Sequence, residues 1–194
     1  MLINVYDFDN TIYRGDSSYD FFRHCAAKYP RVLLSALGSL PGFLAMQLGL
    51  MEKTRVKERF YQYLKHVPEV EEEVERFWQT HDRNLKCWYF EQKRSDDLVI
   101  SASPEFLLRP LMKRLELALL ASRVDPKTGR YDGPNCHGEE KVRRFTKSWP
   151  DTKIEKFYSD SYHDTPLARL AKEPFLVRGD VIKPFPLNGT NPDR

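Results

Sequence analysis

Apolar and polar residues alternate along the chain in a way that predicts a mixed α/β protein. Short apolar runs indicate five strands, at residues 2–6, 98–100, 117–121, 154–158 and 175–177. Helical patterns separate the last four runs, as expected for a parallel sheet with helices on both faces. We therefore predict an α/β fold with a Rossmann-like parallel sheet.

The residues between the first two runs have a different, helical pattern. Apolar side chains recur at helical spacing in three stretches, residues 18–29, 53–65 and 69–84. The spacing predicts an all-helical domain over residues 17–91, inserted into a core formed by residues 1–16 and 92–182. Residues 183–194 contain three prolines and few apolar residues, which predicts an irregular tail.

Two local patterns predict finer features of the core. Ser103 followed by Pro104 is typical of a helix start, with the hydroxyl as N-cap and the proline at the first helical position. The glycine-containing pairs at residues 128–129 and 132–133 predict the turns of a small hairpin.

The composition of the 194 residues is that of a folded globular protein. Apolar residues make up 41% and charged residues 30% of the chain, which disfavours disorder. The net charge of +3 is scattered, so nucleic acid is not an expected partner. Cys25, Cys87 and Cys136 lie far apart, and no signal-peptide pattern is present, so we expect free thiols and a cytoplasmic location.

One apolar stretch complicates this picture. Residues 32–51 contain no charged side chain, and the stretch is about as long as a membrane-spanning helix. Pro41-Gly42 divides it into two pieces that are each too short to cross a bilayer. We favour two short buried helices; a segment that lies in or on a membrane, and so associates the protein with it, is the alternative.

Polar residues follow the predicted strands at the edge of the sheet where α/β proteins bind ligands. They are Asp7 and Asp9 after the first strand, Ser101 after the second, Lys141 on the helix before the fourth, and Asp160 and Asp164 after the fourth. Each residue alone has an ordinary explanation, such as a turn, a cap or a solvated helix position. Their joint placement at one sheet edge favours a functional site.

The residue types at this edge suit the hydrolysis of a phosphate ester. Clustered carboxylates repel one another unless a cation lies between them, and oxygen ligands suit Mg²⁺, which also binds phosphate oxygens. A lysine and a serine can hold and neutralise the phosphate. One carboxylate can act as nucleophile, and a second can protonate the leaving oxygen and then activate water.

Four motifs resemble those of the haloacid dehalogenase (HAD) superfamily, in its phosphoserine-phosphatase-like branch. They are DFDNTI at residues 7–12, VISAS at 99–103, the lysine of GEEKV at 138–142, and YSDSYHD at 158–164. The resemblance covers about residues 1–16 and 92–182, and the helical insertion matches the position of the family's cap domain. It implies the HAD fold and a phosphatase that works through an aspartyl-phosphate intermediate.

The resemblance also implies a role for each motif residue. Asp7 is the expected nucleophile and Asp9 the general acid/base, while Ser101 and Lys141 bind the phosphoryl group. The expected Mg²⁺ ligands are Asp7, the backbone carbonyl of Asp9, Asp160 and, directly or through water, Asp164. The aspartate at position 9 favours phosphatase over dehalogenase chemistry.

The motifs depart from the family pattern at three positions. Ser159 stands where the fourth motif commonly has glycine. His163 stands where close relatives often have asparagine, and it is a candidate for orienting ligands. The third-motif lysine tends to lie one helical turn earlier, at the position of His137, but Lys141 shares that helix face.

Three charged residues are further candidates for contacts with the substrate. Asp16 lies shortly after the first motif, and Arg55 and Arg59 lie in the helical insertion. The alternative, which we favour, is that each is a surface charge on an amphipathic helix.

Three functions are compatible with these patterns. The first is a phosphatase for a small phosphorylated metabolite, with the helical insertion closing over the site. The second is a phosphatase of a lipid phosphate, such as phosphatidylglycerol phosphate, with residues 32–51 at the membrane. The third is a non-catalytic binding protein, which is disfavoured because every catalytic position is present.

Overall fold

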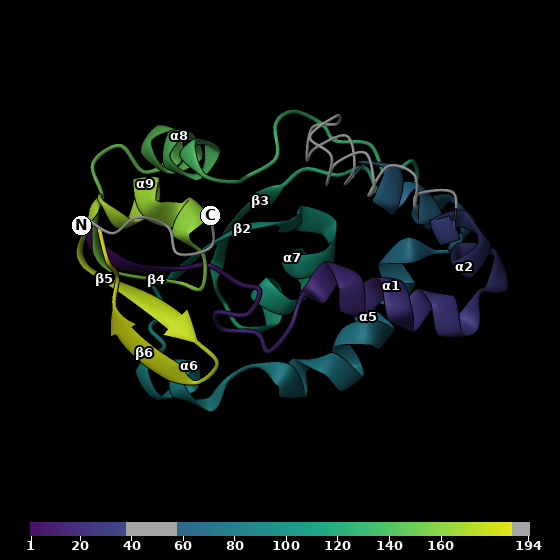
Figure 1. Cartoon of the computed structure of the whole chain (residues 1–194), viewed down its shortest axis with the longest axis horizontal. Coiled ribbons are helices and arrows are strands. Elements are labelled where there is room, and N and C mark those ends of the chain that lie inside the picture. The colour runs from purple at the N-terminus through teal and green to yellow at the C-terminus, as the bar shows by residue number, and fades with distance from the viewer. Residues whose placement is uncertain (38–57, 188–194) are drawn as a thin grey trace.

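The computed structural model describes residues 1–37 and 58–187 of the chain (Figure 1). Within these residues, six strands form one sheet in the order β3-β2-β1-β4-β5-β6. Their bounds are β1 (Leu2–Tyr6), β2 (Leu98–Pro104), β3 (Ala118–Ser122), β4 (Lys153–Ser159), β5 (Ala171–Arg178) and β6 (Val181–Pro184). The first five pair in parallel, so the predicted α/β fold is confirmed.

The described helices fall into two groups along the chain. Those between β1 and β2 are α1 (Ser17–Lys28), α2 (Pro30–Leu37), α5 (Val70–His81) and α6 (Cys87–Gln92), with the 3-10 helices η1 (Gln62–His66) and η2 (Asp82–Asn84). Those after β2 are α7 (Glu105–Arg114), α8 (Glu139–Ser148) and α9 (Thr165–Ala168), with the 3-10 helix η3 (Tyr162–Asp164).

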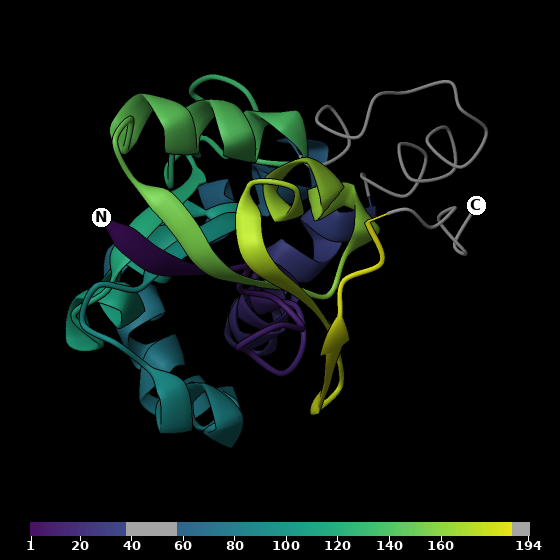
Figure 2. The ribbon, with the colours of Figure 1, turned by 90° about the vertical axis from the view of Figure 1, so that its left-hand side faces the viewer.

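Apolar side chains of the sheet pack in two separate clusters, one on each face. Ile3 and Val5 belong to a cluster that includes residues of α8 and α9, whereas Tyr6 belongs to a cluster that includes residues of α6 and α7. Side chains of a strand alternate between its faces, so this division follows from the order of apolar residues in β1. Figure 2, turned by 90°, shows α8 lying over the sheet.

The helical insertion gathers mainly at one end of the molecule. Figure 1 shows α1, α2 and α5 together, away from β5 and β6, while α6 returns to the sheet. The ring of Tyr89 on α6 packs edge-on against Tyr6, with centroids 4.9 Å apart. The end of the insertion therefore belongs to the packing of the core, and the domain boundary at residue 92 stays a prediction.

Three local predictions differ from the structure. β2 continues through Pro104, and α7 begins at Glu105 with no cap from a described side chain, so the predicted N-cap role of Ser103 is wrong. Residues 62–66 form a 3-10 helix in place of the predicted α-helical end. β6 pairs antiparallel with β5 after a two-residue turn at Gly179 and Asp180, so the tail predicted to be irregular begins with strand residues.

The predicted hairpin after β3 is present as a short irregular one. Val124 and Tyr131 form an isolated antiparallel bridge, and Gly129 donates its N–H to the Asp125 carbonyl at 2.8 Å. Gly129 has a φ of +70°, and a Cβ at this position would lie 2.3 Å from the Tyr61 carbonyl oxygen. The tip of the hairpin thus lies so close to the backbone just before η1 that only glycine fits at position 129.

Candidate active site

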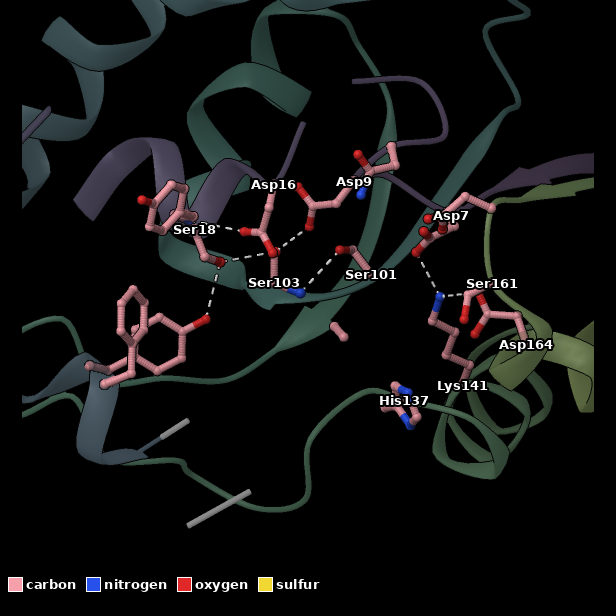
Figure 3. Close-up of a pocket in the computed structure, with 16 residues that line it drawn as sticks. Asp7, Asp9, Asp16, Ser18, Ser101, Ser103, His137, Lys141, Ser161 and Asp164 are labelled. Atoms are coloured by element: carbon pink, nitrogen blue, oxygen red, sulfur yellow. Dashed lines mark hydrogen bonds and ion pairs between the residues drawn. The ribbon is translucent and has the colours of Figure 1, made fainter. Parts of the chain in front are cut away.

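The sheet order brings three polar strand ends to one edge of the molecule. Because β1 lies between β2 and β4, Asp7 is flanked by Ser101 on one side and by Asp160 on the other. A cavity of about 460 Å³ opens at this edge (Figure 3). Its walls are formed by Asp7, Asp9, Asn10, Asp16, Ser18, Tyr19, Phe60, Tyr61, Ser101, Ala102, Ser103, His137, Lys141, Asp160, Ser161 and Asp164.

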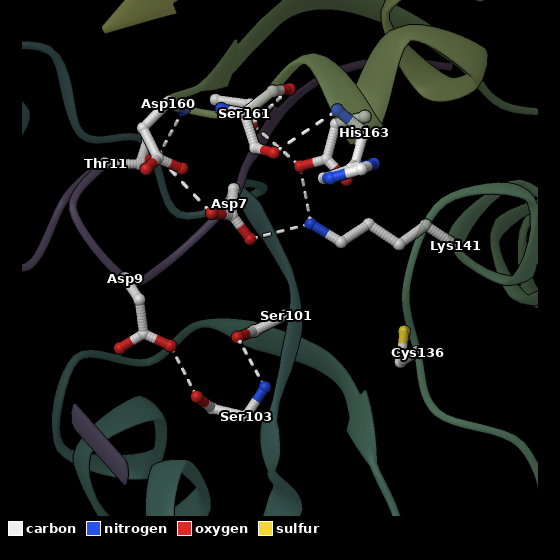
Figure 4. Close-up of polar contacts among 12 residues, drawn as sticks. Asp7, Asp9, Thr11, Ser101, Ser103, Cys136, Lys141, Asp160, Ser161 and His163 are labelled. Carbon is white, nitrogen blue, oxygen red and sulfur yellow. Dashed lines mark hydrogen bonds and ion pairs between the residues drawn. The ribbon is translucent and has the colours of Figure 1, made fainter. Parts of the chain in front are cut away.

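Lys141 forms two ion pairs at the centre of the site. Its Nζ atom lies 2.7 Å from Asp7 Oδ1 and 2.7 Å from Asp164 Oδ2, and the lysine is only 2% exposed (Figure 4). Burial lowers the pKa of Lys141, but the carboxylates of Asp164 and Asp7 outweigh this and hold the pKa above its ordinary value. Lys141 is therefore a fixed positive charge beside Asp7.

Hydroxyl groups position the two acidic motifs relative to each other. Thr11 Oγ1 donates to Asp7 Oδ2 at 3.4 Å and accepts the backbone N–H of Asp160 at 2.9 Å. Ser159 Oγ donates to Asp164 Oδ2 at 2.7 Å. Ser159 thus supports Asp164 at the position where the family commonly has glycine.

Asp9 lies on the opposite side of the cavity from Lys141 (Figure 3). Its Oδ1 atom accepts the backbone N–H of Ser17 at 2.7 Å, and its Oδ2 atom accepts a hydrogen bond from Ser103 Oγ. Burial and the nearby charge of Asp16 raise the pKa of Asp9 to about 7. A carboxyl group with this pKa can both donate and accept a proton near neutral pH.

Negative charge accumulates between the two acidic motifs. Burial raises the pKa of Asp7, with Lys141 opposing the shift. Burial, with the charges of Asp7 and Asp164, raises the pKa of Asp160 to about 7. Lys141 and Arg178 oppose the shift at Asp160 but do not outweigh it, so a further cation that reaches Asp7 and Asp160 would be bound favourably.

The oxygen atoms at this edge are suitable ligands for Mg²⁺. Within residues 1–37 and 58–187, no three acidic, histidine or cysteine side chains form a metal-binding cluster as they lie. Mg²⁺ does not require one, because it is usually bound through one or two carboxylates, waters and substrate phosphate. Asp7, Asp160 and the Asp9 carbonyl fit that requirement in their chemistry.

The other candidates for substrate contacts lie in different places. Asp16 lines the cavity and caps α1, accepting the Tyr19 N–H at 2.9 Å. His163 is exposed beside His137, with ring centroids 4.9 Å apart, and His137 is the one of the two that lines the cavity. Arg59 is exposed and does not line the cavity, and Arg55 lies outside the described residues.

Sequence reasoning missed Ser103 as a residue of the site. Its hydroxyl contacts Asp9 across 94 residues of sequence. The repeated Ser-x-Ser at the end of the second apolar run was the available signal, because alternate strand residues share a face.

A family model for haloacid dehalogenase-like hydrolases matches residues 5–169, a range that includes every motif residue from Asp7 to Asp164. The chain belongs to this family. It is therefore a hydrolase of the HAD superfamily, as the four motifs predicted. No curated protein sequence matches the chain.

Solved structures share this fold at low sequence identity. A protein of unknown function from Bordetella pertussis Tohama I has a TM-score of 0.73 and 20% identity, covering 89% of this chain and 88% of that one. A probable phosphoserine phosphatase from Vibrio cholerae has a TM-score of 0.63 and 13% identity, covering 90% and 55%. A phosphoserine phosphatase in its apo form has a TM-score of 0.55 and 16% identity, covering 89% and 84%.

None of the helices in the described parts of the chain is long and apolar enough to cross a membrane. Most of the uncharged run at residues 32–51 lies outside those parts, and only its beginning is seen, in α2.

Proposed function

We propose that this HAD hydrolase is a magnesium-dependent phosphatase that acts on the phosphate monoester of a small metabolite. One observation carries the proposal: Asp7 lies beside the buried Lys141 ammonium in the same cavity as Asp9, which has a pKa of about 7. A nucleophile, a positive charge and an acid/base are thus brought to one space. Structures with the same fold that are named phosphoserine phosphatases also support it.

The first step transfers the phosphoryl group to the protein. A carboxylate oxygen of Asp7 attacks phosphorus, the bond between phosphorus and the ester oxygen breaks, and Asp9 gives its proton to the leaving alcohol. Among the described contacts, Lys141 uses two N–H groups for Asp7 and Asp164, so its third can donate to a phosphoryl oxygen. Ser101 lines the cavity and can donate to another.

The second step releases inorganic phosphate. Asp9, now ionised, takes a proton from a water molecule that attacks phosphorus, and the bond between Asp7 and phosphorus breaks. The reaction regenerates the Asp7 carboxylate and protonated Asp9. A hydroxyl group from water thus replaces the alkoxy group on phosphorus, and one water is consumed for each phosphate released.

Asp7, Asp160 and the backbone carbonyl of Asp9 would hold the Mg²⁺ ion. When bound, the ion would stabilise the negative charge that develops on the phosphoryl oxygens. Asp164, which accepts hydrogen bonds from Lys141 and Ser159, would act mainly by keeping Lys141 charged and in place.

Hydrolysis of p-nitrophenyl phosphate by the purified full-length chain tests this proposal. We expect turnover with Mg²⁺, loss of turnover with a chelator, and recovery when Mg²⁺ is restored. Asp7→Asn should lower turnover by at least about a thousandfold, whereas the same change at exposed Asp151 should not. Undiminished activity of Asp7→Asn, or activity that persists in the chelator, would refute the mechanism.

A lipid phosphate is the second candidate substrate. Leu33 and Leu34 on α2, at the start of the uncharged run, are 57% and 66% exposed, as expected for a surface that contacts lipid. Salt-resistant sedimentation of the chain with phospholipid vesicles would favour this candidate. A cytoplasmic location is part of the proposal for a soluble metabolite and is supported by the free thiols of Cys25, Cys87 and Cys136.

A further inference from the structure

A row of buried hydroxyl groups leads from the helical insertion to Asp9. Tyr61 OH donates to Ser18 Oγ at 3.1 Å. Ser18 Oγ lies 3.1 Å from Ser103 Oγ, which donates to Asp9 Oδ2 (Figure 3). Tyr61 precedes η1, Ser18 is on α1, and Ser103 is on β2. The row therefore joins two segments of the insertion to one strand of the core.

The hydrogen bond from Ser103 to Asp9 fixes the direction of the others in the row. Ser103 has a single hydroxyl proton, which it donates to Asp9 Oδ2. Ser103 then accepts from Ser18, and Ser18 in turn accepts from Tyr61. Tyr61, Ser18 and Ser103 are 2%, 7% and 5% exposed, so water competes little for these groups, and bonds at low dielectric are strong.

Both oxygens of Asp9 are held by this arrangement. Oδ2 accepts from Ser103, and Oδ1 accepts the Ser17 N–H at 2.7 Å at the start of α1. Two donors on two elements restrict both the position and the rotation of the carboxyl group. Proton transfer to a leaving oxygen depends on such placement, because the acid must lie within hydrogen-bond reach of that oxygen.

Tyr61 also lines the cavity, next to Phe60, and the hairpin tip at Gly129 lies close against its backbone. The wall that would contact the leaving group is thus connected through hydroxyls to the group that would protonate it. We propose that Tyr61, Ser18 and Ser103 form a positioning relay, which aims Asp9 at the leaving oxygen of a substrate seated against this wall. The inference rests on the proposed phosphatase reaction.

The relay acts on one part of the reaction, the protonation of the leaving group. p-Nitrophenyl phosphate has a stable leaving anion and needs little help from an acid. Benzyl phosphate is of similar size, but its alkoxide must be protonated as it leaves. A defect in the aim of Asp9 should therefore slow benzyl phosphate much more than p-nitrophenyl phosphate, whereas a general loss of structure should slow both equally.

The test compares kcat/KM for these two substrates in three single variants. This constant reports the steps up to phosphoryl transfer, and so excludes the later hydrolysis of the intermediate, which is the same for both. Ser103→Ala should lower kcat/KM for benzyl phosphate about tenfold more than for p-nitrophenyl phosphate, since general acids typically contribute 10²–10⁴-fold. Tyr61→Phe, which keeps the ring, should lower kcat/KM for benzyl phosphate about threefold more than for p-nitrophenyl phosphate.

Tyr63→Phe is the matched control. Tyr63 is a buried tyrosine on η1 whose ring packs against Phe22 and Phe60, and it lies outside the relay. Tyr63→Phe also removes one buried hydroxyl group, but it should leave the ratio of kcat/KM for the two substrates unchanged. Equal losses on both substrates in Ser103→Ala and Tyr61→Phe would overturn the relay while leaving the proposed function intact. Absence of turnover by the wild-type chain on both substrates would overturn both.

Discussion

Replacement of Lys141 by methionine removes a buried charge at the centre of the site. Methionine has a similar length and shape, so the change removes the ammonium group with little loss of packing. The Asp7 and Asp164 residues, 8% and 2% exposed, would then face each other without their shared cation. The variant separates the electrostatic role of the lysine from its volume.

The expected loss of stability follows from this geometry. Removal of one partner of a buried ion pair typically costs about 3–5 kcal/mol, because the remaining charge is left uncompensated. Two carboxylates depend on Lys141, so we expect a value near the upper end at neutral pH. Lys147→Met, on the exposed face of the same helix, should cost no more than about 0.5 kcal/mol.

The loss should also depend on pH with a defined sign. Burial already raises the pKa of Asp7, and loss of the ammonium would raise that pKa further. A carboxyl group whose pKa is higher in the folded than in the unfolded protein destabilises the fold at pH values above the unfolded-state pKa. Above that pKa, the group must either stay ionised in an unfavourable environment or take up a proton when the protein folds. The difference between Lys141→Met and the wild type should therefore shrink as the pH falls toward the ordinary aspartate pKa.

Urea unfolding of both lysine variants and the wild type, at neutral and acidic pH, measures these differences. Added Mg²⁺ should recover part of the stability of Lys141→Met, since it supplies positive charge to the same carboxylates. The reasoning would be refuted if Lys141→Met were no less stable than Lys147→Met, or if its deficit grew as the pH fell.

Two further predictions concern the helical insertion. Glu73 is a fully buried carboxylate; burial raises its pKa, but hydrogen bonds, first from Lys28, lower it to about 2. Glu73→Gln should lower the free energy of unfolding by about 2 kcal/mol at neutral pH, which is below the full value of the pKa shift because Lys28 is half exposed. Urea unfolding should show this deficit disappear as the pH falls from 4.5 toward 2. A deficit that does not depend on pH would contradict the ion pairing. Gly129→Ala should lower the melting temperature more than Gly179→Ala. Both glycines have positive φ, but only at Gly129 would the new Cβ lie against a backbone oxygen, that of Tyr61. Equal shifts in melting temperature would show that the close approach is not maintained.

The general position of the site could be predicted because it depends on few features of the sequence. Apolar runs define the strands, and the parallel arrangement brings their carboxyl ends to one edge. Asp7, Ser101 and Asp160 each follow directly after a predicted apolar run, so their proximity required only the sheet order. The pattern around Lys141 predicted its helix correctly, and the helix faces the same edge.

The contacts of individual side chains could not be predicted in the same way. Ser103 has the local pattern of an N-cap, but β2 runs on through Pro104, and the Ser103 hydroxyl instead donates to Asp9. The pairing of Lys141 with Asp164 depends on how α8 and η3 pack, which local periodicity does not encode. Tyr61 is connected to the site through its hydrogen bond to Ser18 on α1, a contact between residues that are far apart in sequence.

Direct detection of a phosphorylated Asp7 tests the central claim most closely. The wild-type chain would be mixed with a ³²P-labelled aryl phosphate and Mg²⁺ for less than one turnover, quenched in acid, and digested. Label released by hydroxylamine, as expected of an acyl phosphate, should map to the peptide that contains Asp7 and be absent from Asp7→Asn. Turnover without any labelled protein, or label on a peptide that lacks Asp7, would contradict the account.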